Sequence, residues 1–136
     1  MMMRMRLLAL AGILGAAAVP AQAGNSPMLG TWINPHHSVA VRTSPCGDAL
    51  CGWVVWANEE AKGDARAAGV ASLVGTQLLS DYRATGPNHY AGTVFVPDHA
   101  RHFASSLSLL GPGQLQIKGC ILGGLICRSQ IWHRAA

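Results

Sequence analysis

Residues 119–132 read Gly-Cys-Ile-Leu-Gly-Gly-Leu-Ile-Cys-Arg-Ser-Gln-Ile-Trp, and this stretch predicts much of the fold. Residues that favour strands flank Gly123-Gly124, a dipeptide typical of the two-residue turn in a β-hairpin. With the turn at this position, Cys120 lies opposite Cys127, so that the two sulfur atoms face each other. The stretch therefore predicts an antiparallel hairpin closed by a disulfide bond.

The same register divides this hairpin into two faces, because side chains alternate across a strand. Gln116 and Lys118 share a face with the two cysteines, and we expect this polar face to be outside. The other face is then inside the protein, and it carries Leu115, Ile117, Arg128, Gln130 and Trp132, with Arg134 in line at the strand end. An inward arginine or glutamine needs a partner, since an unpaired buried polar group costs about 1–3 kcal/mol.

Two explanations for these inward polar side chains stay open. In the structural one, Arg128 or Arg134 stacks on Trp32 and hydrogen-bonds to the backbone at one end of the fold. In the functional one, Arg128 and Gln130 hold the polar end of a ligand whose apolar part lies against inward apolar side chains. The residues expected to line such a site are Val41, Val54, Trp56, Ile117, Arg128, Gln130 and Trp132.

The N-terminus has the order of features that marks a secretory signal peptide. Arg4 and Arg6 precede an uncharged apolar run, Leu7–Val19, and an Ala-Gln-Ala triplet supplies the small residues of a cleavage site. The run is shorter than the roughly 20 residues that a membrane-spanning helix needs. We expect residues 1–23 to be removed, and residues 24–136 to act as one domain in the periplasm of a Gram-negative bacterium or outside the cell.

The remaining two of the four cysteines, Cys46 and Cys51, belong to a second predicted hairpin. A turn at Asp48-Ala49 places them opposite each other; it also puts Val39, Val41, Val54 and Trp56 inside, and Arg42, Trp53 and both cysteines outside. An even number of cysteines in an exported chain predicts disulfide bonds, here Cys46–Cys51 and Cys120–Cys127. For such short loops each bond contributes about 2–2.5 kcal/mol. A four-cysteine zinc site is the alternative, although the spacings are wider than usual ligand pairs.

Alternating runs separated by turn residues predict strands along the whole exported chain. Eight are expected, at residues 30–33, 38–44, 51–57, 76–83, 89–96, 102–110, 114–122 and 125–134. Residues 58–75, rich in alanine and charge, are expected to form a mobile excursion with a short helix. Eight short antiparallel strands favour an all-β, up-and-down barrel, because closure leaves no free sheet edge. A two-sheet β-sandwich is the alternative.

Several blocks of the sequence carry a resemblance: Gly30-Thr31-Trp32, Pro45-Cys46-Gly47, Leu50-Cys51-Gly52, Val54-Val55-Trp56 and residues 119–132. Together they resemble the bacterial envelope family known as domain of unknown function 2147. This resemblance implies an exported protein of uncharacterised activity with a calycin-like or lipocalin-like barrel. The Gly-x-Trp opening and an arginine on the last strand are similar to the lipocalin pair that closes one end of the barrel. The middle of the chain lacks the Asp/Pro/Gly-rich loop that the resemblance implies.

Composition and motifs narrow the function. Two of the basic residues behind the net charge of +4 lie in the leader, so the exported chain carries +2, which does not suggest nucleic acid as a partner. No Gly-x-Ser-x-Gly elbow or paired carboxylates indicate an enzyme. His36-His37 and the cluster of Asp98, His99 and His102 read as solvated loop residues, and we expect no metal or cofactor. The expected function is to bind a small apolar or amphipathic molecule, such as a fatty acid or lipid fragment. The alternative is an envelope interaction module whose barrel is filled by its own side chains.

Overall fold

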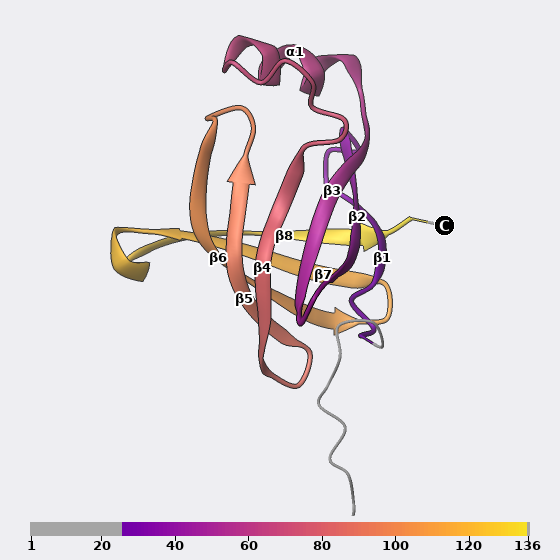
Figure 1. The fold of residues 1–136 in the computed structure, drawn as a ribbon, viewed down its shortest axis with the longest axis vertical. Helices are drawn as coiled ribbons and strands as arrows, with labels where there is room; N and C mark the ends of the chain where they lie inside the picture. Colours follow the sequence, from indigo (N-terminus) through magenta and orange to yellow (C-terminus); the bar gives the residue numbers. More distant parts are fainter. Residues whose placement is uncertain (1–25, 136) are drawn as a thin grey trace, which may run out of the picture.

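The computed structural model describes residues 26–135, which form a small barrel with one helix lying across an end (Figure 1). Eight antiparallel strands pair in chain order, and β8 returns to β1 to close the barrel. The strands are β1 (Gly30–Ile33), β2 (Val39–Cys46), β3 (Ala49–Ala57), β4 (Gln77–Gly86), β5 (His89–Val96), β6 (Arg101–Gly111), β7 (Gln114–Ile121) and β8 (Ile126–Arg134). The expected up-and-down barrel is confirmed, and the alternative β-sandwich is wrong. The expected signal peptide, residues 1–23, lies outside the described residues.

Helix α1 (Glu59–Ala67) forms in the segment between β3 and β4. The Asn58 side chain caps it by accepting a hydrogen bond of 2.9 Å from the Ala61 backbone N–H. Glu59 and Glu60 in its first turn interact favourably with the positive end of the helix dipole. Ala65 is fully buried and belongs to the hydrophobic core. The segment that the sequence predicted to be a mobile excursion is therefore packed onto the barrel by one face of a helix.

The β2–β3 hairpin turns one residue earlier than the sequence predicts. Gly47-Asp48 form the connection, and Cys46 pairs with Ala49 rather than with Cys51. Gly47 has a φ of 61°, which glycine adopts without steric cost. The predicted Cys46–Cys51 disulfide is nevertheless present, because the two Cα atoms are only 5.8 Å apart in this diagonal arrangement. Cys51 is 4% exposed, but it lies between Leu50 and Gly52, whose positions face the interior, so it keeps the outward face expected for it.

A β-bulge changes which side chains of β3 face inward. Val41 pairs with Val54, but the next pair is Ala40 with Trp56, so β3 carries one extra residue at this point. Val41 and Val54 are buried, as expected, whereas Trp56 is 47% exposed. The inward position expected for Trp56 is wrong, because the bulge shifts the alternation of side chains and turns Trp56 outward.

Trp32 and Arg134 close one end of the barrel. The Trp32 indole is buried and donates a hydrogen bond of 3.0 Å to the Met28 carbonyl. The guanidinium carbon of Arg134 lies 4.3 Å from the centroid of the Trp32 ring, a cation–π contact. The same guanidinium donates to three backbone carbonyls at 2.7–2.9 Å. Of the two arginines considered from the sequence, Arg134 makes this contact and Arg128 does not.

Much of the barrel interior is tightly packed. The largest fully buried side chains are Trp32, Tyr82, Met28, Leu50, Leu79, Leu107, Leu115, Val41 and Val54. A Cβ atom at Gly52 would lie 2.9 Å from side-chain atoms of Leu79 and Val41, and one at Gly92 would lie 2.7 Å from the Ser80 carbonyl oxygen. Gly92 requires glycine, because backbone atoms already occupy the space of a side chain, whereas a side chain at position 52 would require Leu79 and Val41 to shift.

Candidate ligand-binding site

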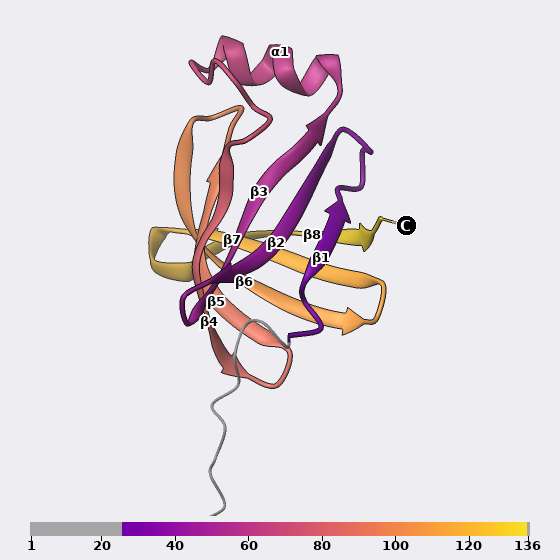
Figure 2. The same ribbon diagram turned by 45° about the vertical axis from the view of Figure 1, so that its right-hand side comes forward.

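The barrel is open along most of β8. β8 pairs with β1 only at Trp32–Arg134 and Ile33–His133, because β1 is four residues long. Ile126–Ile131 pair with β7 on one side, and among residues 26–135 no strand pairs with them on the other. Side chains in this segment are exposed. The β7–β8 hairpin extends away from β1 in both views (Figures 1 and 2), and residues 121–131 of this hairpin are exposed.

A row of small residues crosses the inner face of β5, β6 and β7 and ends at Arg128 on β8. Gly92 pairs with Ser105, Ser105 with Gly119, and Gly119 with Arg128. Directly paired residues share a face, and a Cβ at Gly92 would meet the Tyr82 ring inside the barrel. The row therefore leads from the packed interior to the open side. We refer to Ser105, Gly119 and Arg128 as the inner row.

Two hydroxyl groups are buried at the interior end of this row. Tyr82 of β4 is 0% exposed and Ser105 of β6 is 8% exposed, and neither hydroxyl oxygen has a hydrogen-bond partner among the described residues. Burial raises the pKa of Tyr82, and the neighbouring Ser105 hydroxyl opposes that rise to a smaller extent. The two hydroxyls therefore lie close enough to interact with each other, although their distance and angle do not meet the criteria of a hydrogen bond. Since each unpartnered buried hydroxyl costs about 1–3 kcal/mol, the pair needs an explanation.

The inner face is not filled at Gly119. A Cβ atom at Gly119 would approach only Val94, at 3.8 Å, which is an ordinary contact. Further along the same sheet lies an open hollow of about 500 Å³, lined by His99, Arg101, Phe103, Ile121 and Leu122. Sites for small ligands have volumes of roughly 300–1,000 Å³. The hollow lies on the strands that carry Ser105 and Gly119, although neither of these residues lines it.

The sheet that carries the inner row is positively charged. Residues 101–134 contain the basic residues Arg101, Lys118, Arg128 and Arg134, and no aspartate or glutamate. None of the ion pairs among the described residues includes Arg128. The acidic residue at the border of this sheet, Asp98, faces His99 at 4.0 Å. Lys118 lies on the outer face and Arg134 is bound at the barrel end, so Arg101 and Arg128 are the basic side chains of this sheet that favour an anionic group on the inner face.

The structure separates the residues that the sequence predicted to line one site. The buried ones, which belong to the packed core, are Val41, Val54 and Trp132. Ile117 is half-buried opposite Gln130, in the predicted register. Arg128 and Gln130 are exposed, and the Gln130 side-chain oxygen accepts a hydrogen bond of 3.0 Å from the Trp132 indole. An enclosed pocket around all these residues is therefore wrong, and Ile117, Arg128 and Gln130 are the ones that lie on the open side near Gly119.

Sequence analysis did not identify Tyr82 and Ser105 as functional residues. The strands that contain them and their pairing in an up-and-down barrel were expected, but the register of β5 with β6 and of β6 with β7 was not assigned. Without that pairing, nothing in the sequence aligns Ser105 with Gly92 and Gly119. The available signal was the occurrence of small residues inside three neighbouring strands, where glycine is otherwise disfavoured.

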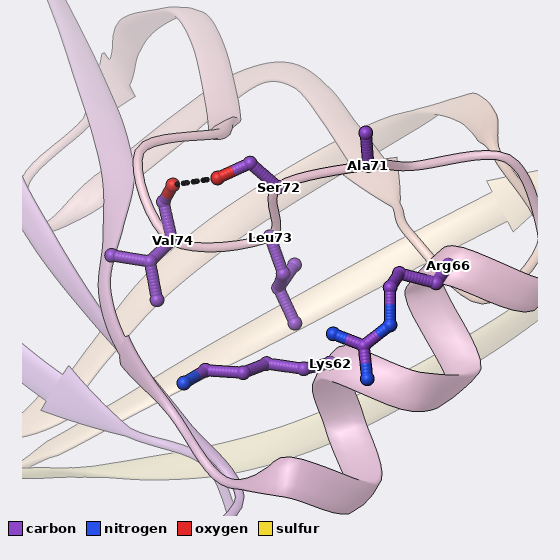
Figure 3. A pocket seen from close by; sticks show the side chains of 6 residues that line it. All are labelled: Lys62, Arg66, Ala71, Ser72, Leu73 and Val74. Atoms are coloured by element: carbon purple, nitrogen blue, oxygen red, sulfur yellow. Dashed lines mark hydrogen bonds between the residues drawn. The ribbon is translucent and has the colours of Figure 1, made fainter.

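A second, smaller hollow of about 250 Å³ lies between α1 and the segment that follows it (Figure 3). Lys62 and Arg66 project into it from the helix. Lys62 already pairs with Glu59 at 3.2 Å, and the Ser72 hydroxyl donates to the Val74 carbonyl at 3.0 Å. The buried hydroxyls without partners lie elsewhere. We therefore use this hollow as a negative control for ligand binding at the open inner face.

The second predicted disulfide, Cys120–Cys127, is present, with the two residues directly opposite as predicted. All four cysteines form disulfides, so the zinc alternative is wrong. In residues 26–135 no group of three or more His, Cys, Asp and Glu side chains is arranged to hold a metal ion. That part of the chain also contains no helix with the length and apolar character needed to cross a membrane.

Similarity to known proteins is found at the level of family and fold. The family described as "uncharacterized protein conserved in bacteria (DUF2147)" matches residues 30–134. Among solved structures, protein HP1028 from the human pathogen Helicobacter pylori, described as belonging to the lipocalin family, aligns with a TM-score of 0.59. The identity is 11%, over 79% of this chain and 82% of HP1028, so the likeness concerns the fold. No curated protein matches the sequence.

Proposed function

This chain belongs to the bacterial DUF2147 family, and we propose that it binds one small anionic amphipathic molecule on the open inner face of its barrel. A fatty acid or a lipid fragment with a single acyl chain has this chemistry. The anionic group would lie over Gly119 beside the Arg128 guanidinium, and the side chains that cover the buried Ser105 and Tyr82 hydroxyls would move aside for those groups to bind it. The apolar part would lie along Ile117 or in the hollow next to Phe103.

The observation that carries this proposal is the pair of buried hydroxyls without partners. Tyr82 and Ser105 are donors inside an apolar barrel, and they lie at the end of a row that leads to Arg128, which forms no ion pair among the described residues. An anionic oxygen accepts hydrogen bonds from such donors, and these charge-assisted bonds are stronger than those between neutral groups. The ligand would therefore remove the cost of leaving the hydroxyls unpartnered.

The magnitudes support binding in the micromolar range. A ligand that buries roughly 300 Å² of apolar surface gains about 7 kcal/mol. Two or three hydrogen bonds to a charged group add about 1.5–3 kcal/mol each, and association costs at least about 4 kcal/mol. The balance is near the value of about −8 kcal/mol that corresponds to a Kd of roughly 1 μM.

Calorimetric titration of delipidated protein with sodium decanoate tests the proposal. We expect saturable binding of one decanoate at neutral pH and weaker binding of decanol, which has no charge. Ser105→Ala should lower the affinity for decanoate about tenfold, because it removes one hydrogen bond to a charged group. Ser106→Ala is the matched control, since Ser106 is the next residue of β6 and points to the opposite face.

The proposal fails if decanoate does not bind, or if Ser105→Ala and Ser106→Ala have the same affinity as the unmodified protein. Equal affinity for decanol and decanoate would show that the apolar surface binds the chain without the inner row.

A second candidate function is an interaction module of the bacterial envelope without a small ligand. The tight packing around Trp32, Gly52 and Gly92 favours it, because a barrel filled by its own side chains has no room for a ligand. The two candidates differ in the calorimetric experiment: an interaction module gives no saturable signal with decanoate or decanol.

We also propose that the protein acts outside the cytoplasm, as the leader in residues 1–23 predicts. Two disulfides support this, because such bonds persist in oxidising compartments. After expression of the full chain in a Gram-negative host, we expect the protein in the periplasmic fraction, beginning at Gly24 and without free thiols. A cytoplasmic protein with four reactive thiols would contradict the proposal.

A further inference from the structure

We propose that the turn of the β7–β8 hairpin docks the protein on a phospholipid bilayer that carries anionic headgroups. Four apolar side chains form this surface, which we call the tip: Ile121, Leu122, Leu125 and Ile126. The proposal stands on the exposure of the tip, the backbone of its turn and the charge of the sheet behind it. It does not depend on a ligand in the inner row.

The tip places large apolar side chains in solvent. Leu125 is 85% exposed and Leu122 is 67% exposed, and the neighbouring Ile126 and Ile121 are 50% and 42% exposed. These four residues are contiguous at the end of a hairpin that projects from the barrel in both views (Figures 1 and 2). Single exposed leucines are common, whereas a contiguous apolar group at a projecting end marks an interaction site.

The backbone holds the tip in this form before any contact. The Cys120–Cys127 disulfide links the two strands directly behind it. Leu122, Gly123 and Gly124 have φ values of 54°, 65° and 94°, in the left-handed region that a leucine rarely adopts. The Leu125 N–H donates to the Leu122 carbonyl at 3.3 Å and closes the turn. A turn fixed in this way loses little conformational entropy on docking.

The charge behind the tip selects the partner. Lys118 and Arg128 lie on the two strands of the hairpin, and Arg101 lines the hollow together with Ile121 and Leu122. Residues 101–134 contain no acidic side chain, so a second copy of the chain would bring like charges together at this surface. An anionic bilayer suits both the apolar and the basic side chains, because the apolar ones enter the acyl region while the basic ones remain at the headgroups.

Co-sedimentation with vesicles tests this proposal. We expect the protein to bind vesicles of phosphatidylglycerol mixed with phosphatidylcholine, and to bind phosphatidylcholine vesicles much more weakly. Leu125→Asp should lower the partition coefficient about tenfold or more, because a leucine leaves the acyl region. Lys118→Gln should lower it about fivefold at low salt, the contribution of one basic residue near an anionic surface. Leu125 does not line the hollow, so decanoate affinity should be unchanged in Leu125→Asp.

Leu110→Asp is the matched control. Leu110 is 51% exposed and lies on β6 near Gly111, where that strand turns into β7 at the opposite end of the sheet. We expect this variant to bind vesicles like the unmodified protein. Equal losses in Leu110→Asp and Leu125→Asp, or equal binding to neutral and anionic vesicles, would overturn the proposal. So would light scattering that shows a dimer which Leu125→Asp dissociates, together with no vesicle binding, since the occupant would then be a second copy.

Discussion

Replacing Tyr82 with phenylalanine removes a single oxygen atom from the centre of the barrel. We predict that Tyr82→Phe makes the ligand-free protein more stable and binds decanoate more weakly. Both effects follow from the same feature, a buried hydroxyl that has no partner among the described residues. Opposite changes in stability and binding distinguish a functional group from a structural one.

The magnitude follows from the burial of this side chain. Tyr82 is 0% exposed, and its ring lies against Gly92, where a Cβ would come within 2.7 Å of it. Phenylalanine keeps the ring and leaves no cavity, so the change relieves the cost of the unpartnered hydroxyl, about 1–3 kcal/mol. Each kcal/mol raises the melting temperature by about 4–8 °C in a domain of roughly 60–100 residues. The affinity for decanoate should fall about tenfold, because one hydrogen bond to a charged group is lost.

Urea denaturation of delipidated protein measures the first effect, and calorimetric titration measures the second. The denaturation midpoint should rise while the slope stays constant, which indicates a change in stability alone. Tyr90→Phe is the matched control: Tyr90 is 9% exposed, and its hydroxyl is not one of the buried groups without a partner. We expect this control to change stability by less than about 0.5 kcal/mol.

A Tyr82→Phe protein that loses about 1 kcal/mol would refute this reasoning, because the hydroxyl would then have a stabilising partner in the native protein. Increased stability with unchanged decanoate affinity would contradict the prediction on binding, since the hydroxyl would be unpartnered but outside the site.

Three further predictions concern stability. Burial raises the pKa of Tyr82 above its unfolded value near 10. The stability that this difference contributes is therefore complete below pH 10 and falls at higher pH, by up to about 1.4 kcal/mol per pH unit. Thermal melts above pH 10 should show a steeper loss of stability in the unmodified protein than in Tyr82→Phe. Gly92→Ala should destabilise the protein by about 1–3 kcal/mol through overpacking. In Gly119→Ala the new Cβ meets only Val94, at 3.8 Å, so urea denaturation should show unchanged stability. This second variant should nevertheless bind decanoate less tightly. Arg134→Ala should lower the free energy of unfolding by at least about 2 kcal/mol, since it removes three hydrogen bonds to backbone carbonyls. Arg128→Ala should leave the urea midpoint unchanged. Equal losses of stability in the two variants would contradict the structural role assigned to Arg134.

Local features of the sequence predicted the β7–β8 hairpin correctly. A glycine pair between two cysteines fixes both the turn and the register, and Cys120 lies opposite Cys127 as predicted. The sequence determines the register of the β2–β3 hairpin less well, because turns at Gly47-Asp48 and at Asp48-Ala49 both bring Cys46 near Cys51. The bulge that turns Trp56 outward is also not a local property, since its extra residue shows only in the pairing with β2.

The site could be predicted only in part, for a physical reason. Inward alternation placed Arg128 on the correct face, but its exposure depends on the short β1, which leaves part of β8 unpaired. The same short strand explains why Arg134, at the β1 pairing, stacks on Trp32. The approach of Tyr82 to Ser105 depends on the packing of three strands, which no pattern within one strand encodes.

Chemical-shift mapping tests most directly whether the inner row binds an anionic amphipathic molecule. Amide spectra of the isotope-labelled, delipidated protein would be followed during titration with sodium decanoate. We predict saturable shifts that are largest at Ser105, Gly119 and Arg128, with small shifts at Lys62 and Arg66 in the hollow beside α1. The claim is contradicted if no amide shifts saturate, or if the largest shifts fall at Lys62 and Arg66.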